Sequence, residues 1–160
     1  MKKMLISLLV LMLSGISCVF ASEVTKFSRS FIKHFKDCDV YEETVTSTFE
    51  DEEFKSQRKI LGWKNGVCRY TETITSKSGG YRLNCNFPEI QVDELYDAMR
   101  NRSKTPERFN LEIFTPEVDP KTGETVYVTK GTTLIKGNKA YIAWAKYQNN
   151  PYFCKAEKIR

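Results

Sequence analysis

The chain has 160 residues, of which 25 are basic and 20 acidic, and a formal net charge of +5. Hydrophobic residues make up 41% of the sequence, enough for a packed core. The basic residues alternate with acidic ones and do not gather in one run, which disfavours a nucleic-acid-binding protein.

Residues 1–21 have the pattern of a cleavable secretory signal peptide. Two lysines precede an uninterrupted apolar run at residues 4–13. Val19 and Ala21 supply the small residues that signal peptidase accepts, which predicts cleavage between Ala21 and Ser22. As a helix the apolar run would rise only about 15 Å, half of a hydrocarbon core, so no membrane span is expected. The sequence predicts a secreted or periplasmic protein.

Cys18 offers one alternative, a lipid anchor at that cysteine. The residues before it, 15–17, fit the lipoprotein pattern poorly, so the sequence disfavours the anchor.

Residues 22–160 are predicted to form a single domain of 139 residues stabilised by disulfides. Four cysteines remain after cleavage, and an even number in an exported protein predicts two disulfides. A zinc site is disfavoured because no two of these cysteines lie closer than seventeen residues apart. The four cysteines are Cys38, Cys68, Cys85 and Cys154.

The chain begins with a helix and continues with strands. Apolar residues recur at helical spacing over residues 22–36 and predict an amphipathic helix. The period then changes to two, which predicts strands at residues 40–49 and 54–63. Asn65-Gly66 favours a type I′ turn into a third strand, and a fourth is expected near residues 81–87. The pairs expected around the Asn-Gly turn are Lys64 with Val67, Trp63 with Cys68, Leu61 with Tyr70, and Lys59 with Glu72.

This meander guides the disulfide pairing. If the next two glycines form a turn, Ile74 pairs with Cys85, and Cys68 then lies roughly 20 Å away along its strand. A disulfide tolerates a Cα separation of only about 7 Å, so a Cys68–Cys85 bond is disfavoured. Cys38 ends the first helix near Cys68. The favoured pairs are therefore Cys38 with Cys68 and Cys85 with Cys154.

The second half of the domain is less regular. Pro88 opens a helix with apolar spacing through Met99. Residues 105–137 could form an extra hairpin or a loop, and a short helix follows around residues 141–148. The predicted fold class is α+β, with an N-terminal helix, a four-stranded antiparallel meander and then helices packed on one face of the sheet.

The sequence predicts no catalytic residue, no metal site and no cofactor. His34 is the only histidine and lies on the first helix, where a surface role is favoured over a catalytic one. Glu42 and Glu43 point to opposite faces of one strand, and residues 50–53 form an acidic turn. A small exported hydrolase, glycosidase-like and using a carboxylate pair, remains the alternative function.

Aromatic residues late in the chain suggest an interaction surface instead. Placed poorly for the expected core, they could form an exposed patch that binds a protein or an envelope component of unknown identity. The candidate partner surface consists of Tyr127, Tyr141, Tyr147 and Tyr152. The favoured function is an exported, non-catalytic binding or accessory domain.

Residues 62–70, with the pattern G-W-K-N-G-x-C-x-Y, resemble a stretch found in small exported bacterial proteins of uncharacterised function. In those proteins a cysteine like Cys38 closes an N-terminal helix, a cysteine strand like residues 83–87 follows, and a late Pro-x-x-Cys resembles residues 151–154. The resemblance implies a shared four-cysteine framework and carries no activity. The helix and meander are also similar to cystatin-like folds, but residues 57–62 do not match their inhibitory loop, so protease inhibition is not implied.

Overall fold

The computed structural model describes residues 27–49, 51–101, 103 and 105–159. The predicted signal peptide, its cleavage site between Ala21 and Ser22, and Cys18 lie outside the described residues. The chain divides into two compact units. We call residues 26–102 with 152–160 the sheet unit, and residues 103–151 the hairpin unit.

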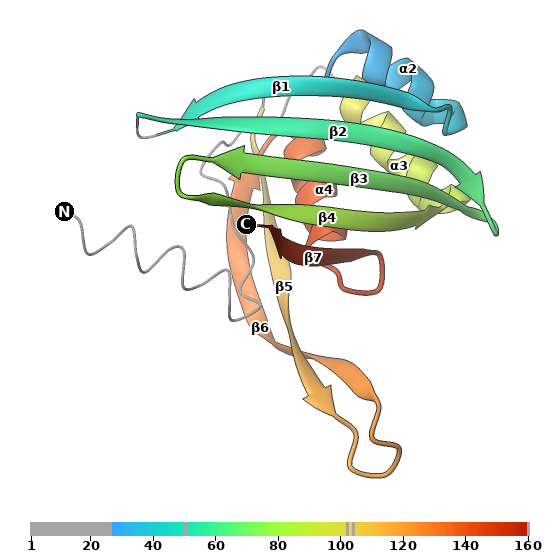
Figure 1. Ribbon diagram of the computed structural model, residues 1–160, viewed down its shortest axis with the longest axis vertical. Helices are drawn as coiled ribbons and strands as arrows, with labels where there is room; N and C mark the ends of the chain where they lie inside the picture. The colour runs from blue at the N-terminus through green and yellow to red at the C-terminus, as the bar shows by residue number, and fades with distance from the viewer. Residues whose placement is uncertain (1–26, 50, 102, 104, 160) are drawn as a thin grey trace. The chain divides into compact units, whose positions relative to one another are not determined.

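The sheet unit contains a five-stranded antiparallel sheet in the order β1-β2-β3-β4-β7 (Figure 1). The strands are β1 (Tyr41–Phe49), β2 (Glu52–Lys64), β3 (Val67–Ser76), β4 (Gly79–Pro88) and β7 (Cys154–Ile159). Four of them follow each other along the chain, and β7 joins the edge of β4 from the far end of the sequence.

The two faces of this sheet differ in chemistry because successive side chains of a strand point to opposite faces. One row of paired residues, Ile60, Tyr70 and Cys85, is buried on the face that we call the inner face. The neighbouring row, Lys59, Thr71 and Asn84, lies on the outer face. The outer face is polar, so the core of this unit lies on the inner side.

Two helices cover part of the inner face: α2 (Arg29–Asp37) and α3 (Glu89–Arg100). The apolar stripe of α2 is fully buried, and Phe31 lies edge-on to Tyr70 with 6.1 Å between ring centroids. Phe35 makes the same kind of contact with Phe87 at 6.2 Å. Ser28 begins α2 because its side chain accepts a hydrogen bond from the Phe31 amide.

The predicted pairing of β2 with β3 holds only for the two residue pairs nearest the turn that joins them. Lys64 pairs with Val67 and Trp63 with Cys68, as predicted. A β-bulge then shifts the register between Ile60 and Gly62, and Gly62 has a φ of 86° that favours glycine. The predicted pairs of Leu61 with Tyr70 and of Lys59 with Glu72 are therefore wrong. The observed pairs are Ile60 with Tyr70, Lys59 with Thr71, and Arg58 with Glu72.

The turn between β3 and β4 was also placed wrongly. Gly79 and Gly80 belong to β4, and Tyr70, not Ile74, pairs with Cys85. Gly80 is required for close approach, because a Cβ there would lie 2.6 Å from the carbonyl oxygen of Ile74.

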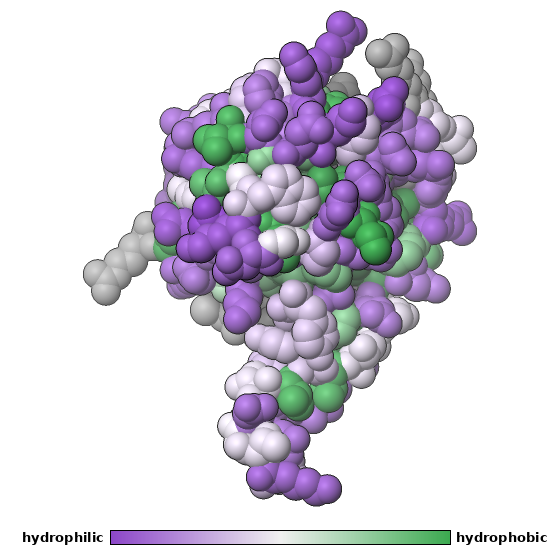
Figure 2. Space-filling model, turned by 90° about the vertical axis from the view of Figure 1, so that its right-hand side faces the viewer, coloured by the Kyte–Doolittle hydropathy of each residue, from purple (hydrophilic) through white to green (hydrophobic). Residues whose placement is uncertain are grey.

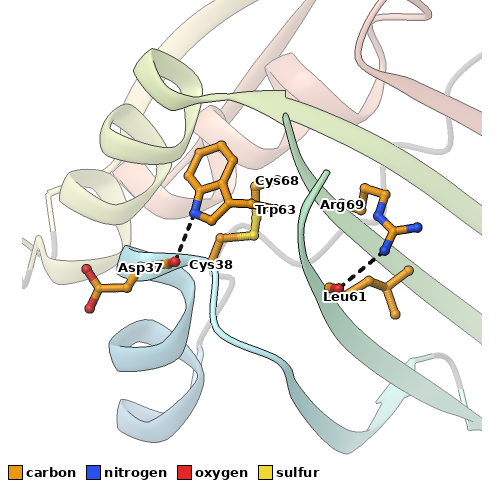
Figure 3. The surroundings of a disulfide bond; sticks show 6 residues. All are labelled: Asp37, Cys38, Leu61, Trp63, Cys68 and Arg69. Carbon is orange, nitrogen blue, oxygen red and sulfur yellow. Dashed lines mark hydrogen bonds between the residues drawn. A yellow bond between two sulfur atoms is a disulfide. The ribbon is translucent and has the colours of Figure 1, made fainter. Parts of the chain in front are cut away.

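The expected disulfides are confirmed as a feature of the fold. The structure joins Cys38 to Cys68 with a Cα separation of 5.8 Å, and Cys85 to Cys154 with 4.1 Å, which is the pairing that the sequence favoured. Figure 3 shows the first bond beside Trp63, whose indole N–H donates to the Asp37 carbonyl at 3.0 Å. This bond ties the end of α2 to β3, whereas the second ties β4 to β7.

The hairpin unit consists of β5 (Glu107–Val118), β6 (Thr125–Gly137) and α4 (Lys139–Gln148). The two strands form a separate antiparallel sheet across residues 105–137, where the sequence had allowed a hairpin or a loop. α4 packs on the base of this hairpin, where Leu111, Ile135 and Tyr141 are buried together.

The predicted fold class is wrong. The structure is mostly antiparallel β, with 56% of residues in strands, seven strands in two sheets and three short helices among the described residues. The α+β prediction failed because it left residues 105–137 open between a hairpin and a loop and did not expect β7. No described helix is long and apolar enough to cross a membrane.

The two disulfides give a stability prediction. Replacing Cys38 and Cys68 with alanine should lower the free energy of unfolding by about 3–4 kcal/mol, because the unfolded chain regains the entropy of an open loop. The pair Cys85 and Cys154 closes a longer loop, with a sequence separation of 69 against 30. Its removal should cost about 0.7 kcal/mol more. Urea unfolding of both double variants checks this, and a negligible loss in either would contradict it.

Candidate functional site

A row of charged side chains crosses the inner face of the sheet. Glu43, Arg58 and Glu72 lie opposite one another on β1, β2 and β3. Arg58 Nη1 lies 3.3 Å from Glu43 Oε1, and Arg58 Nε lies 3.1 Å from Glu72 Oε1. Their side chains are only 8–10% exposed. We call these three residues the ion row.

Neutral groups complete the hydrogen bonding of the ion row. The Tyr70 hydroxyl donates to Glu72 Oε2 at 3.0 Å, and the Ser56 hydroxyl donates to Glu72 Oε1. On the other side, the hydroxyl of Ser28, which caps α2, donates to Glu43 Oε2. The Arg58 guanidinium also lies 4.5 Å from the centroid of the Phe27 ring.

Burial and charge perturb two members of this cluster. Burial is the largest single effect and opposes the charge of Arg58, but Glu72, Tyr70 and Glu43 together outweigh it and raise the pKa of Arg58 above its ordinary value. Burial, with the Glu72 charge beside it, raises the pKa of the Tyr70 hydroxyl well above its ordinary value of about 10. Arg58 therefore stays charged and Tyr70 stays neutral across the physiological range.

This arrangement bears on the hydrolase alternative. A glycosidase needs two carboxyl groups that face each other across a cleft with a proton to give. Here both oxygens of Glu43 and of Glu72 already accept hydrogen bonds from protein groups. Glu42 lies on the outer face in an exposed ion pair with Lys59 at 3.1 Å. The ion row has the geometry of a structural network.

The predicted partner surface is placed differently by the structure. Tyr141 and Tyr147 are 8% and 3% exposed, which is inconsistent with an exposed patch. Tyr141 is buried because it packs with Leu111 and Ile135 in the core of the hairpin unit. Tyr152 is 67% exposed but belongs to the sheet unit, and Tyr127 is half-buried on β6.

His34 takes part in a local contact on α2. Its ring stacks on Tyr41 with 4.5 Å between centroids, and its Nδ1 lies 2.8 Å from the Ser30 carbonyl oxygen. Among the residues that the structure describes, no group of three or more His, Cys, Asp or Glu side chains could hold a metal ion.

The hairpin unit carries the second candidate. Figure 1 shows β5 and β6 continuing well beyond α4, and we call residues 115–128 the arm. Val118 is 67% exposed and Val126 is 38% exposed, and they lie on opposite faces of the hairpin. Val128 is half-buried and lies on the same face as Val126. Figure 2 shows pale and green side chains along this arm and hydrophilic ones at its tip.

The arm ends in a well-formed turn. The Asp119 amide donates to the Glu124 carbonyl, and the Gly123 amide donates to the Asp119 carbonyl, both at 2.8 Å. Gly123 has a φ of 72°, which this turn requires. Below the turn, Lys130 forms an ion pair with Glu117 across the strands. The arm is therefore a regular hairpin and presents its apolar side chains in fixed rows.

A pocket in the same unit is too small for most ligands. It has a volume of about 190 Å³, whereas pockets for small molecules usually measure roughly 300–1,000 Å³. Phe109, Phe114, Lys146 and Asn150 are among its lining residues. The arm is thus the stronger candidate for recognition.

The sequence left this hairpin open between a hairpin and a loop, although a strand signal was present. Phe109, Leu111 and Ile113 alternate with polar residues, as in a strand with one buried face. Pro116 interrupts this pattern, but proline is tolerated in strands at an edge.

The ion row gives a prediction with a control in the neighbouring position. Arg58→Met leaves two buried carboxylates without their cation and should lower the free energy of unfolding by about 3–5 kcal/mol. Lys59→Met removes the exposed pair with Glu42 and should cost less than about 1 kcal/mol. Chemical unfolding measures both. An equal loss of unfolding free energy in the two variants would show that the ion pairs of Arg58 in the ion row contribute no more than the exposed pair of Lys59.

Tyr70 gives a pH dependence. Because its pKa is raised in the folded state, unfolded Tyr70 loses its proton first, near pH 10, and the folded state retains it. Stability from this group is complete below pH 10 and declines as the pH rises above it. Thermal unfolding should show a steeper loss of stability above pH 10 for the unmodified protein than for Tyr70→Phe. Parallel curves for the two proteins would contradict the assignment.

Comparisons of the chain with protein-family models, with curated proteins and with solved structures found no match. The function of the chain is therefore inferred from the geometry and chemistry of its own residues.

Proposed function

We propose that this chain is an exported, non-catalytic binding or accessory domain that recognises a protein partner through the arm. The observation that carries the proposal is the exposure of Val118 and Val126 on a regular hairpin. Exposed apolar side chains gathered on one projecting element mark interaction sites more often than singly scattered ones do.

The chemistry of the arm suits a protein surface. Its strands place Tyr127 beside Pro116 and Val126 beside Glu117, so aromatic and aliphatic groups have a polar rim. Interfaces between proteins combine such an apolar centre with polar surroundings, and tyrosine is common at their centres. The regular turn fixes the arm before binding, which reduces the entropy lost on association.

The sheet unit has the stability that an exported domain needs. Its two disulfides and the ion row cross-link strands and α2, and its outer face is polar. Disulfides form and persist in oxidising compartments, so they fit an extracellular or periplasmic location. Together with the predicted signal peptide at residues 1–21, this supports a partner in the envelope or outside the cell.

Site-specific photo-crosslinking tests the proposal. A photoreactive amino acid at Val118 should crosslink a partner in cells that produce the full chain, because this side chain is exposed on the arm. The same amino acid at Thr46, exposed on the outer face of the sheet, is the matched control. Replacing Val126 with serine should reduce the yield at Val118.

The outcomes separate clearly. A distinct product from Val118 that is absent from Thr46 supports the arm as the binding surface. Equal products from both positions, or none from Val118, would contradict the proposal. Thermal unfolding of the Val126→Ser protein should remain close to that of the unmodified protein, which excludes loss of the fold as the cause.

A further inference from the structure

Three cations on the outer face of the sheet form no ion pair with any residue that the structure describes. Arg69 lies opposite Asn86, and Lys155 lies opposite Asn84 in the next row of this face. Arg82 lies in the row after that. Successive rows of one face are about 7 Å apart, and neighbouring strands about 5 Å. The neutral residues Thr71, Asn84 and Asn86 lie among the cations, and we call all six residues the cationic patch.

Arg69 is the cation that the protein satisfies least. Its Nη2 lies 3.5 Å from the Leu61 carbonyl oxygen, a long contact that Figure 3 shows. Its Nε is buried and has no hydrogen-bond partner among the described residues, which is rare for a buried donor. A guanidinium whose donors are mostly unused can bind a carboxylate or phosphate group through two parallel hydrogen bonds.

Acidic residues offset the charge of the patch at one corner only. Glu42, on the outer face of β1, is already paired with Lys59 at 3.1 Å. Glu157 lies opposite Arg82 and two residues from Lys155, and it is the one carboxylate in the three rows of the patch on β3, β4 and β7. The patch therefore has an excess of positive charge. Arg82, Asn86 and Lys155 are exposed, so this charge is accessible.

We propose that the cationic patch binds an acidic polysaccharide. Such a polymer carries anionic groups separated by hydroxyl groups, and the patch has cations separated by neutral polar side chains. The cations would pair with the anionic groups, while the threonine and asparagine side chains exchange hydrogen bonds with sugar hydroxyls. A single-stranded nucleic acid fits less well, because its bases stack on aromatic side chains and none of the described residues in these rows is aromatic.

This inference does not rest on the proposed function. The cationic patch belongs to β3, β4 and β7 of the sheet unit, whereas the arm belongs to β5 and β6 of the hairpin unit. A chain that binds no polysaccharide can still crosslink a protein through Val118, and the reverse also holds.

Titration with soluble polysaccharides tests the patch. The labelled mature chain is titrated with alginate, which carries carboxylates, with phosphorylated dextran, and with unmodified dextran as the neutral control. At least one anionic polymer should bind, with an affinity that falls as the salt concentration rises, and the neutral dextran should not. Lack of binding to both anionic polymers would overturn the proposal. Tighter binding to duplex DNA or to phosphatidylglycerol vesicles would also overturn it.

Matched charge variants locate the site. One triple variant combines Arg69→Gln, Arg82→Gln and Lys155→Gln, and it should bind roughly tenfold more weakly, as expected for the loss of three exposed ion pairs. The control removes the same charge from exposed positions of α2 and should bind like the unmodified protein. It combines Arg29→Gln, Lys33→Gln and Lys36→Gln. Equal losses of affinity in the two variants would contradict the location.

A single carboxylate should give the opposite change. Glu157→Gln removes the acid beside Arg82 and Lys155, so it should strengthen binding. Glu89→Gln removes the same charge at the start of α3 and should leave the affinity unchanged. Circular dichroism and thermal unfolding confirm that each variant is folded. Unchanged or weaker binding of the Glu157→Gln protein would overturn the proposed site.

Discussion

The bulge at Gly62 decides which residues of β2 face the core of the sheet unit. One extra residue in β2 shifts the register, so that Arg58 and Ile60 reach the inner face and Lys59 reaches the outer face. Without that shift, a lysine would lie opposite Glu72, and Leu61 would be opposite Tyr70. The planar guanidinium of Arg58 can bind two carboxylates at once, which a lysine does less well. The ion row therefore depends on a backbone irregularity at a single glycine.

The ion row links the pairing register of β1, β2 and β3 to the position of α2. On the inner face the ion row lies between apolar side chains: Ile60 and Tyr70 on one side and Ile74 on the other. A buried ion pair costs desolvation and is weak evidence for net stability. Its arrangement is nevertheless specific, because a slip of one residue would bury a charge without its partner. Since Ser28 joins the same network and caps α2, the position of this helix is coupled to the pairing of three strands.

Local signals predicted much of the sheet unit, and failures arose where tertiary contacts decide. Asn65-Gly66 specified its turn correctly because its required φ angles are local. Gly80 looked like a turn residue, but it is needed where the Ile74 carbonyl approaches the backbone of β4. The six residues of β7 show no apolar alternation, and they form a strand through pairing with the edge of β4. Such contacts between distant parts of the chain leave little trace in a single sequence.

The candidate site illustrates the same limit. Tyrosines drew attention because they are large, yet Tyr141 and Tyr147 are buried, and the exposed arm residues are two valines that are unremarkable in a sequence. A two-stranded hairpin has two faces and two edges, and α4 packs only at its base. Apolar residues further along the arm therefore cannot all be buried by their own hairpin unit. The exposed faces are therefore the surfaces through which the arm can associate.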